Sequence, residues 1–93
     1  MKKKTKNTAA DIWDAAWTRY IDSIKWLETA VGNHKTAVAE GRMRNSLDRY
    51  CSGAKTSLTA SVKKLRLVDE DFCNRHRIYD GKAEAKRIMD ELI

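Results

Sequence analysis

The longest amphipathic stretch of the chain runs from Trp13 to Val31 and reads WDAAWTRYIDSIKWLETAV. Its large apolar residues recur at alternating steps of four and three: Trp13, Trp17, Tyr20, Ile24, Leu27 and Val31. An α-helix turns every 3.6 residues, so this spacing places all these side chains on one face of a helix. The stretch therefore predicts a helix of about five turns that is buried along one side.

Residues typical of helix ends flank this first stretch. Thr8 can accept a hydrogen bond from the free amides of the first turn, and Asp11 is favoured there by the helix dipole. Gly32 and Asn33 both tolerate the left-handed conformation that ends many helices. We therefore expect the first helix to run from about residue 8 to about residue 31.

A second helix is predicted from about Lys35 to about Val68. Its apolar face consists of Met43, Leu47, Tyr50, Cys51, Ala54, Leu58, Val62 and Leu65. Val38 lies off this face, so the pattern allows a break or kink near Gly41. Gly53 is a second weak point, because glycine inside a helix costs about 1 kcal/mol relative to alanine.

Shorter helices are predicted after Val68. Residues 69–71 are acidic and can cap a short helix that carries Phe72, Cys73 and His76. Residues 79–81, with the sequence YDG, have the composition of a turn, and a last helix is expected from Lys82 to the C-terminus. The residues that this last helix buries are Ala85, Ile88, Met89 and Leu92.

Together these elements predict an all-α protein. The expected architecture is a small antiparallel bundle of two long helices and one or two short C-terminal helices. The absence of proline and the presence of only 4 glycines favour long helices over a turn-rich β fold. We expect one helical domain over residues 8–93, preceded by a flexible basic arm over residues 1–7.

The composition excludes several classes of protein. Hydrophobic residues make up 42% of the chain and charged residues 34%, a balance typical of a globular protein rather than a disordered one. No apolar run approaches the roughly 18 residues of a membrane span, and no apolar stretch follows the lysine-rich start as it would in a secretory signal. Two cysteines are too few for a disulfide framework, so a reduced, cytoplasmic protein is expected.

The residues that catalysis or metal binding would need are few. A nucleophile and its base would have to come from Cys51 or Cys73 with His34 or His76, and no catalytic motif surrounds them. Cys73 and His76 have the spacing of half a zinc site, but no second close pair completes it. We therefore expect no catalytic residues, no metal and no cofactor, and the protein is interpreted as a non-enzyme.

Trp26 lies off the apolar face of the first helix. At 100° per residue it points roughly 200° away from Trp13. Either another helix of the chain covers this second face or a partner does, and tryptophan is enriched among residues that dominate interface energies. The candidate protein interface on this face consists of Ile12, Arg19, Ser23, Trp26 and Ala30.

Positive charge is concentrated in two segments of the chain, whose net charge is +6. Residues 1–7 carry four lysines without an acid, and residues 42–66 carry seven bases against Asp48 alone. These bases could neutralise phosphates, or they could form a solvated face on which Lys55 and Arg66 pair with acids of the first and last helices. The candidate nucleic-acid contacts are Lys2, Lys3, Lys4, Lys6, Arg42, Arg49, Lys63 and Lys64.

Two functions are compatible with these patterns. The first is a helical binding protein that acts by stoichiometric docking on a protein or nucleoprotein machine, such as a phage or mobile-element inhibitor of the anti-CRISPR type, or an adaptor. The alternative is a nucleic-acid-binding protein, for example a DNA-binding regulator, that uses the lysine arm and the basic second helix. A homodimer is a further possibility, because a small chain that buries two faces of one helix can require a second copy.

Overall fold

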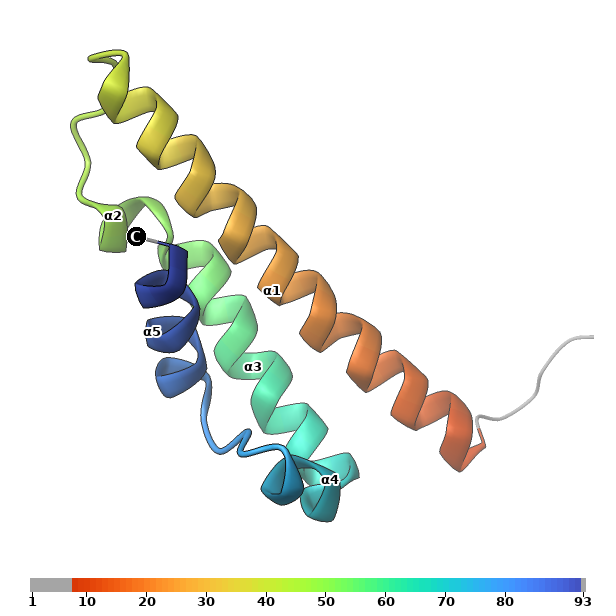
Figure 1. The fold of residues 1–93 in the computed structure, drawn as a ribbon. Helices are drawn as coiled ribbons and strands as arrows, with labels where there is room; N and C mark the ends of the chain where they lie inside the picture. Colours follow the sequence, from red (N-terminus) through yellow and green to blue (C-terminus); the bar gives the residue numbers. More distant parts are fainter. Residues whose placement is uncertain (1–7, 93) are drawn as a thin grey trace, which may run out of the picture.

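The structure is a computed structural model that describes residues 8–92, and it contains five helices in that range (Figure 1). They are α1 (Ala9–Ala39), α2 (Leu47–Tyr50), α3 (Ser52–Val68), α4 (Glu70–Arg75) and α5 (Gly81–Leu92). α3 packs antiparallel to α1, and α5 returns along α3 in the opposite direction. No strand occurs within the described residues, so the predicted all-α bundle is confirmed. The predicted flexible arm, residues 1–7, lies outside them.

Helix α1 begins where the sequence predicts and ends eight residues later than expected. Thr8 accepts a hydrogen bond from the Asp11 amide at 3.1 Å, and the Asp11 carboxylate accepts one from the Thr8 amide at 3.3 Å. The predicted end at Gly32 is wrong, because the helix continues through Gly32 to Ala39. Val31 and Ala37 are both buried, and this packing on either side of the glycine outweighs its low helix propensity. The residue with a left-handed backbone beyond this helix end is Gly41, with a φ of 74°.

The predicted second helix is divided in the structure. Residues 35–39 belong to α1, and a loop that includes Gly41 follows, at the break that the pattern allowed. The chain breaks again at Cys51, between α2 and α3, two residues before Gly53. Tyr50, predicted to be buried as part of one continuous helix, lies at the end of the separate helix α2 and is 38% exposed.

The two C-terminal helices form where the sequence predicts, but Leu92, predicted to be buried, is 37% exposed at the last residue of α5. Asp69 caps α4 by accepting a hydrogen bond from the Phe72 amide at 3.0 Å. At the start of α5, the Asp80 carboxylate accepts a hydrogen bond from the Ala83 amide at 2.9 Å. Asp69 therefore caps α4 as predicted, whereas Asp80, predicted as part of a turn, also caps a helix. α4 and α5 are placed across the end and along the side of α3 (Figure 1).

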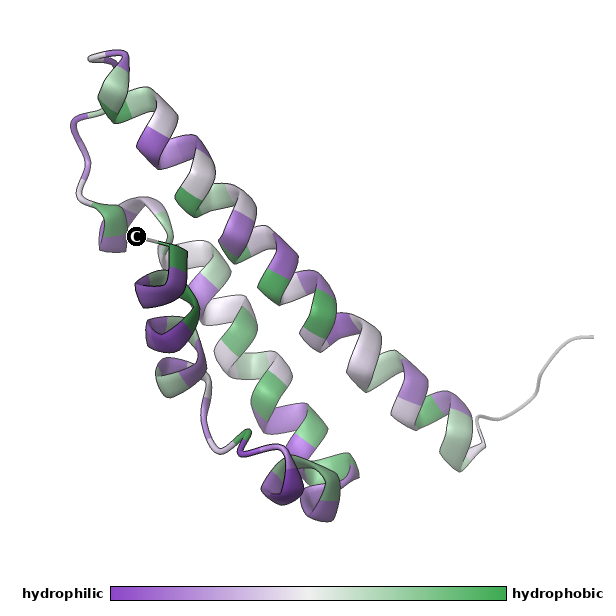
Figure 2. Cartoon of the chain, in the orientation of Figure 1, coloured by the Kyte–Doolittle hydropathy of each residue, from purple (hydrophilic) through white to green (hydrophobic). Residues whose placement is uncertain are grey.

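The core lies where α1, α3 and α5 meet. Leu27, Leu58 and Leu65 are fully buried there, and the hydrophobic segments alternate with hydrophilic ones along each helix (Figure 2). Trp13 and Trp17, predicted as core residues, are only partly buried. Their rings stack on each other at 5.6 Å and both meet the edge of Phe72 from α4. They close the end of the bundle rather than fill its centre.

Polar contacts connect α1 to the elements around it. The Tyr20 hydroxyl donates to the Glu84 carboxylate of α5 at 2.8 Å, and the Trp13 indole N–H donates to Asp69 at 2.9 Å. Burial, together with the hydrogen bond to Glu84, raises the pKa of Tyr20 above its ordinary value of 10.0. Each contact joins residues far apart in the sequence, so both fix the position of α1 relative to the C-terminal helices.

Candidate docking surface

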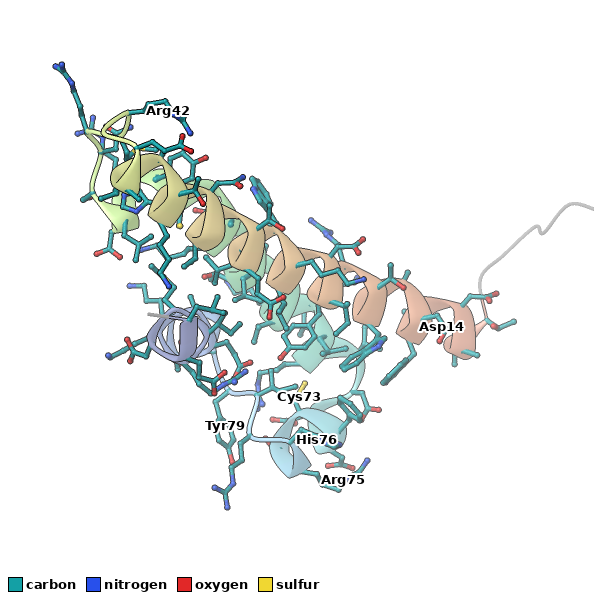
Figure 3. The ribbon with its side chains drawn as sticks, turned by 45° about the horizontal axis from the view of Figure 1, so that its top comes forward. Asp14, Arg42, Cys73, Arg75, His76 and Tyr79 are labelled. Atoms are coloured by element: carbon teal, nitrogen blue, oxygen red, sulfur yellow. The ribbon has the colours of Figure 1, made fainter. Side chains whose placement is uncertain are left out.

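The residues considered for catalysis or metal binding do not gather in one place. Cys51 and Cys73 are buried, and burial raises the pKa of both thiols, which makes them poor nucleophiles. His34 hydrogen-bonds the carbonyl of Asn45 at 2.9 Å. His76 is exposed and packs on Phe72, whereas Cys73 is buried (Figure 3). Within residues 8–92, no three His, Cys, Asp or Glu side chains are grouped so that they could hold a metal ion.

The predicted protein interface divides into an exposed part and a buried part. Ile12 and Trp26 are 40% and 52% exposed, and Arg19 is exposed beside them. Ser23 and Ala30 are buried against the rest of the bundle, with only 3% and 7% of their surface exposed. These two side chains stabilise the fold and are not available to a partner, so they leave the candidate set.

Trp26 rests on the neighbouring helix without being covered by it. A Cβ atom placed on Gly53 of α3 would lie 3.3 Å from Cζ2 and 3.4 Å from Cη2 of the Trp26 ring. Because glycine has no side chain, the edge of the indole can lie against α3 while half of its surface stays exposed. One edge of the ring therefore contacts α3, and the rest of the ring is exposed to solvent.

A shallow hollow lies farther along the same side of α1. It has a volume of about 210 Å³ and is lined by Ile12, Ala15, Ala16, Arg19 and Lys64. Within the described residues, Arg19 and Lys64 form no ion pair. We call Ile12, Ala15, Arg19, Trp26, Gly53 and Lys64 together the Trp26 surface.

Three serines pack directly beneath this surface. The Ser23 hydroxyl lies 2.8 Å from the hydroxyls of both Ser57 and Ser61, and the Ser61 hydroxyl also donates to the Ser57 carbonyl at 2.8 Å. Small side chains let α1 and α3 approach closely, and their hydroxyl groups satisfy one another. The contact between α1 and α3 at these three serines is therefore closely packed.

The predicted nucleic-acid contacts are dispersed. The four lysines of residues 1–7 lie outside the described part of the chain. Arg42 follows α1, at the end of the molecule opposite to α4 (Figure 3), and pairs with Glu40 at 2.6 Å. Arg49 lies on α2, and Lys63 and Lys64 lie on the second half of α3. The breaks at residues 40–46 and at Cys51 place these bases on separate elements, so they do not form one continuous helical face.

The ion pairs expected for the flanking bases form with other partners. Lys55 pairs with Asp48 of α2 at 3.1 Å, and Arg66 pairs with Glu70 of α4 at 3.3 Å. The prediction of acids from the first and last helices is therefore wrong. Each base instead reaches the nearest acid across an adjacent break in the chain.

None of the described helices combines the length and the apolar character that a membrane crossing would require. No protein-family model, no curated protein and no solved structure matches the chain. Its class is therefore defined by the fold alone: a small all-α bundle in which α1, α3 and α5 share one core.

Proposed function

We propose that this protein is a non-enzymatic binding module that docks the Trp26 surface onto a protein or nucleoprotein partner and acts by occupying it. An inhibitor encoded by a phage or another mobile element, anti-CRISPR-like in its mode of action, is one form of such a protein, and an adaptor is another. Both cysteines are free thiols, which suits a reducing cytoplasmic location.

The observation that carries this proposal is the state of Trp26. It exposes 52% of its surface although it lies near the middle of the longest helix. Its ring is already positioned against Gly53, so a partner that covers it would lose little side-chain entropy on binding. Exposed but fixed aromatic residues are typical of the centres of protein interfaces.

The charges at the neighbouring hollow indicate the character of the partner. Arg19 and Lys64 stand at the rim of the neighbouring hollow, whose floor is formed by Ile12, Ala15 and Ala16. An apolar floor with unpaired cations at its rim is complementary to a protein surface that offers an apolar side chain beside carboxylates. We therefore propose an acidic docking partner.

A substitution at Trp26 tests the proposal. Partners captured from a nuclease-treated lysate of the source cells would be purified and titrated against wild-type protein, Trp26→Ala and Val38→Ala. Val38 is a matched control, because it lies on α1 and is also 52% exposed. We expect Trp26→Ala to raise the Kd at least tenfold and Val38→Ala to change it by less than twofold. If both variants bind like the wild type and keep its helical dichroism, the Trp26 surface is not the interface.

The alternative, nucleic-acid binding, is favoured by Lys63 and Lys64. Both are exposed on α3, and neither forms an ion pair within the described residues. The nuclease treatment separates the two functions: captured material that disappears with nuclease supports nucleic-acid binding, and material that remains supports a protein partner.

A further inference from the structure

A second and larger surface feature lies between α3 and α5. It consists of two hollows of about 540 and 620 Å³ that meet at Thr59. Gly81 packs against Thr59 at the point where they join. We call the two hollows together the α3–α5 groove. No residue of the Trp26 surface lines it, so it is a separate site.

The groove combines a buried apolar floor with apolar side chains that are exposed. Val62, Ala85 and Met89 form part of the floor and are at most 7% exposed. Leu67 and Tyr79 stand at one end and are 80% and 56% exposed. Leu67 is the most exposed large hydrophobic residue of the described chain. Such side chains beside a groove mark a surface that another apolar surface covers.

The shape of the groove matches a helix. Its lining on α3 runs from Ser52 to Leu67, about 22 Å at 1.5 Å per residue. α5 lies antiparallel to α3 along the first half of this length, and residues 79–81 continue the wall along the second half (Figure 1). One hollow lies between α3 and α5 and the other between α3, Glu70 and residues 79–81, and their combined length corresponds to a helix of about 15 residues.

The charges of the two walls favour an acidic occupant. Five cationic residues line the groove against four acidic ones. Three of the acids are engaged by cations of the walls, in the pairs Lys55–Asp48, Lys86–Asp90 and Arg66–Glu70. The fourth, Asp80, caps α5 and forms no ion pair within the described residues, so the lining keeps a net charge of +1. Lys63 on α3 and Lys82 on α5 form no ion pair within residues 8–92. One unpaired lysine therefore stands on each wall.

We propose that the α3–α5 groove binds an amphipathic helix of a partner protein, with apolar side chains packed on the exposed Leu67 and Tyr79 and acidic residues facing Lys63 and Lys82. This site goes beyond the proposed function, because a chain with two separate docking surfaces can hold two partners at once. Loss of one site leaves the other intact, so the two proposals fail independently.

A designed peptide tests the proposal directly. The probe is a fluorescein-labelled helical peptide of 15 residues, with leucines at steps of three and four and glutamates flanking them. The control peptide carries lysine in place of each glutamate. We expect saturable binding in fluorescence anisotropy, with a Kd for the glutamate peptide at least tenfold below that of the lysine peptide. The double variant Lys63→Glu, Lys82→Glu should reverse this order.

Three controls separate the groove from general charge attraction and from misfolding. Lys25→Glu with Lys35→Glu makes the same change in net charge on α1, which does not line the groove, and should keep the order of the two peptides. Leu67→Asp should weaken the glutamate peptide at least tenfold without lowering the melting temperature, and Trp26→Ala should change its Kd by less than twofold.

The proposal is overturned if neither peptide shows saturable binding, or if Lys63→Glu, Lys82→Glu still binds the glutamate peptide more tightly than the lysine peptide. It is also overturned if Leu67→Asp and Trp26→Ala raise the Kd of the glutamate peptide equally. It is also overturned if the wild type sediments as a dimer and Leu67→Asp as a monomer, because the occupant would then be a second copy of the chain.

Discussion

Gly81, at the first position of α5, lies directly against the backbone of Thr59 in the middle of α3. A Cβ atom placed on Gly81 would be 2.7 Å from the Thr59 nitrogen and 2.8 Å from its Oγ1, closer than real Cβ contacts. Only glycine can therefore occupy position 81 without moving Thr59. It determines where α5 begins its return along α3, and so it positions the core residues Ala85, Ile88 and Met89.

Gly81→Ala should destabilise the fold strongly. The added methyl group meets backbone atoms that cannot move aside without separating the two helices. Overpacking of this kind costs about 1–3 kcal/mol, and we expect the upper half of that range. Urea unfolding followed by circular dichroism measures the loss as a lower free energy of unfolding.

Gly32→Ala is the matched control for this substitution. Gly32 lies inside α1, and a Cβ atom there would meet nothing within 4 Å. Replacing it removes only the conformational cost of a glycine in a helix, so stability should rise by about 0.5–1 kcal/mol. A loss of stability in Gly81→Ala together with a gain in Gly32→Ala supports the contact between Gly81 and Thr59. A similar change in the free energy of unfolding for both variants would contradict it.

Tyr20→Phe should remove the hydrogen bond between α1 and α5. Glu84 keeps Arg87 as a partner at 3.0 Å, so the carboxylate is not left alone, and we expect a loss of about 1–2 kcal/mol at neutral pH. Chemical denaturation at pH 7 measures this loss directly. A variant as stable as the wild type would show that solvent replaces the tyrosine hydroxyl without cost.

The same tyrosine should make stability fall in alkali. Burial and the Glu84 contact raise the pKa of Tyr20 in the folded state above its ordinary value of 10.0. Its contribution to stability is therefore present below about pH 10 and is lost as the pH rises further, because the unfolded chain releases the proton first. Melting temperatures between pH 8 and pH 11 should fall more steeply for the wild type than for Tyr20→Phe.

Local sequence signals predicted the helix ends only where packing agreed with them. Thr8 and Asp69 cap helices as predicted, because each cap uses atoms within one turn of the chain. Gly32 and Asn33 resemble a helix end equally well, but buried residues on both sides continue α1 past them. That outcome depends on tertiary packing, which no local pattern contains.

The Trp26 surface was predictable only in part, again because contacts between distant segments decide which of its residues are buried. Trp26 stands off the apolar face of α1, and its exposure follows from that pattern. Ser23 was misplaced because the signal that buries it comes from α3, where Ser57 and Ser61 recur at a step of four residues. The α3–α5 groove has no signal along the sequence, since Leu67 and Tyr79 come together only when the chain turns at α4.

Asp69→Asn should weaken the response of stability to acid. The Phe72 amide and the Trp13 indole N–H donate to the Asp69 carboxylate and hold its pKa below the ordinary value of 3.8. The lowered pKa stabilises the fold above about pH 4, and this contribution is lost as the pH falls through the folded-state pKa, because the unfolded chain takes up the proton first. The variant should be less stable than the wild type at pH 7, with a gap that narrows towards pH 2. If the difference in free energy of unfolding between wild type and Asp69→Asn stays constant from pH 7 to pH 2, the lowered pKa of Asp69 is contradicted.

Deletion of residues 1–7 distinguishes the two proposed functions by their dependence on salt. The segment contains Lys2, Lys3, Lys4 and Lys6. If each lysine neutralises one DNA phosphate, log affinity for duplex DNA should fall against log salt with a slope steeper by about 3.6 in the full chain than in the deletion, because each contact contributes about 0.9. Filter binding or anisotropy between 50 and 200 mM salt measures both slopes. Equal slopes, or no binding at the lowest salt, would leave the lysines without a role in binding DNA and would favour the protein-docking function.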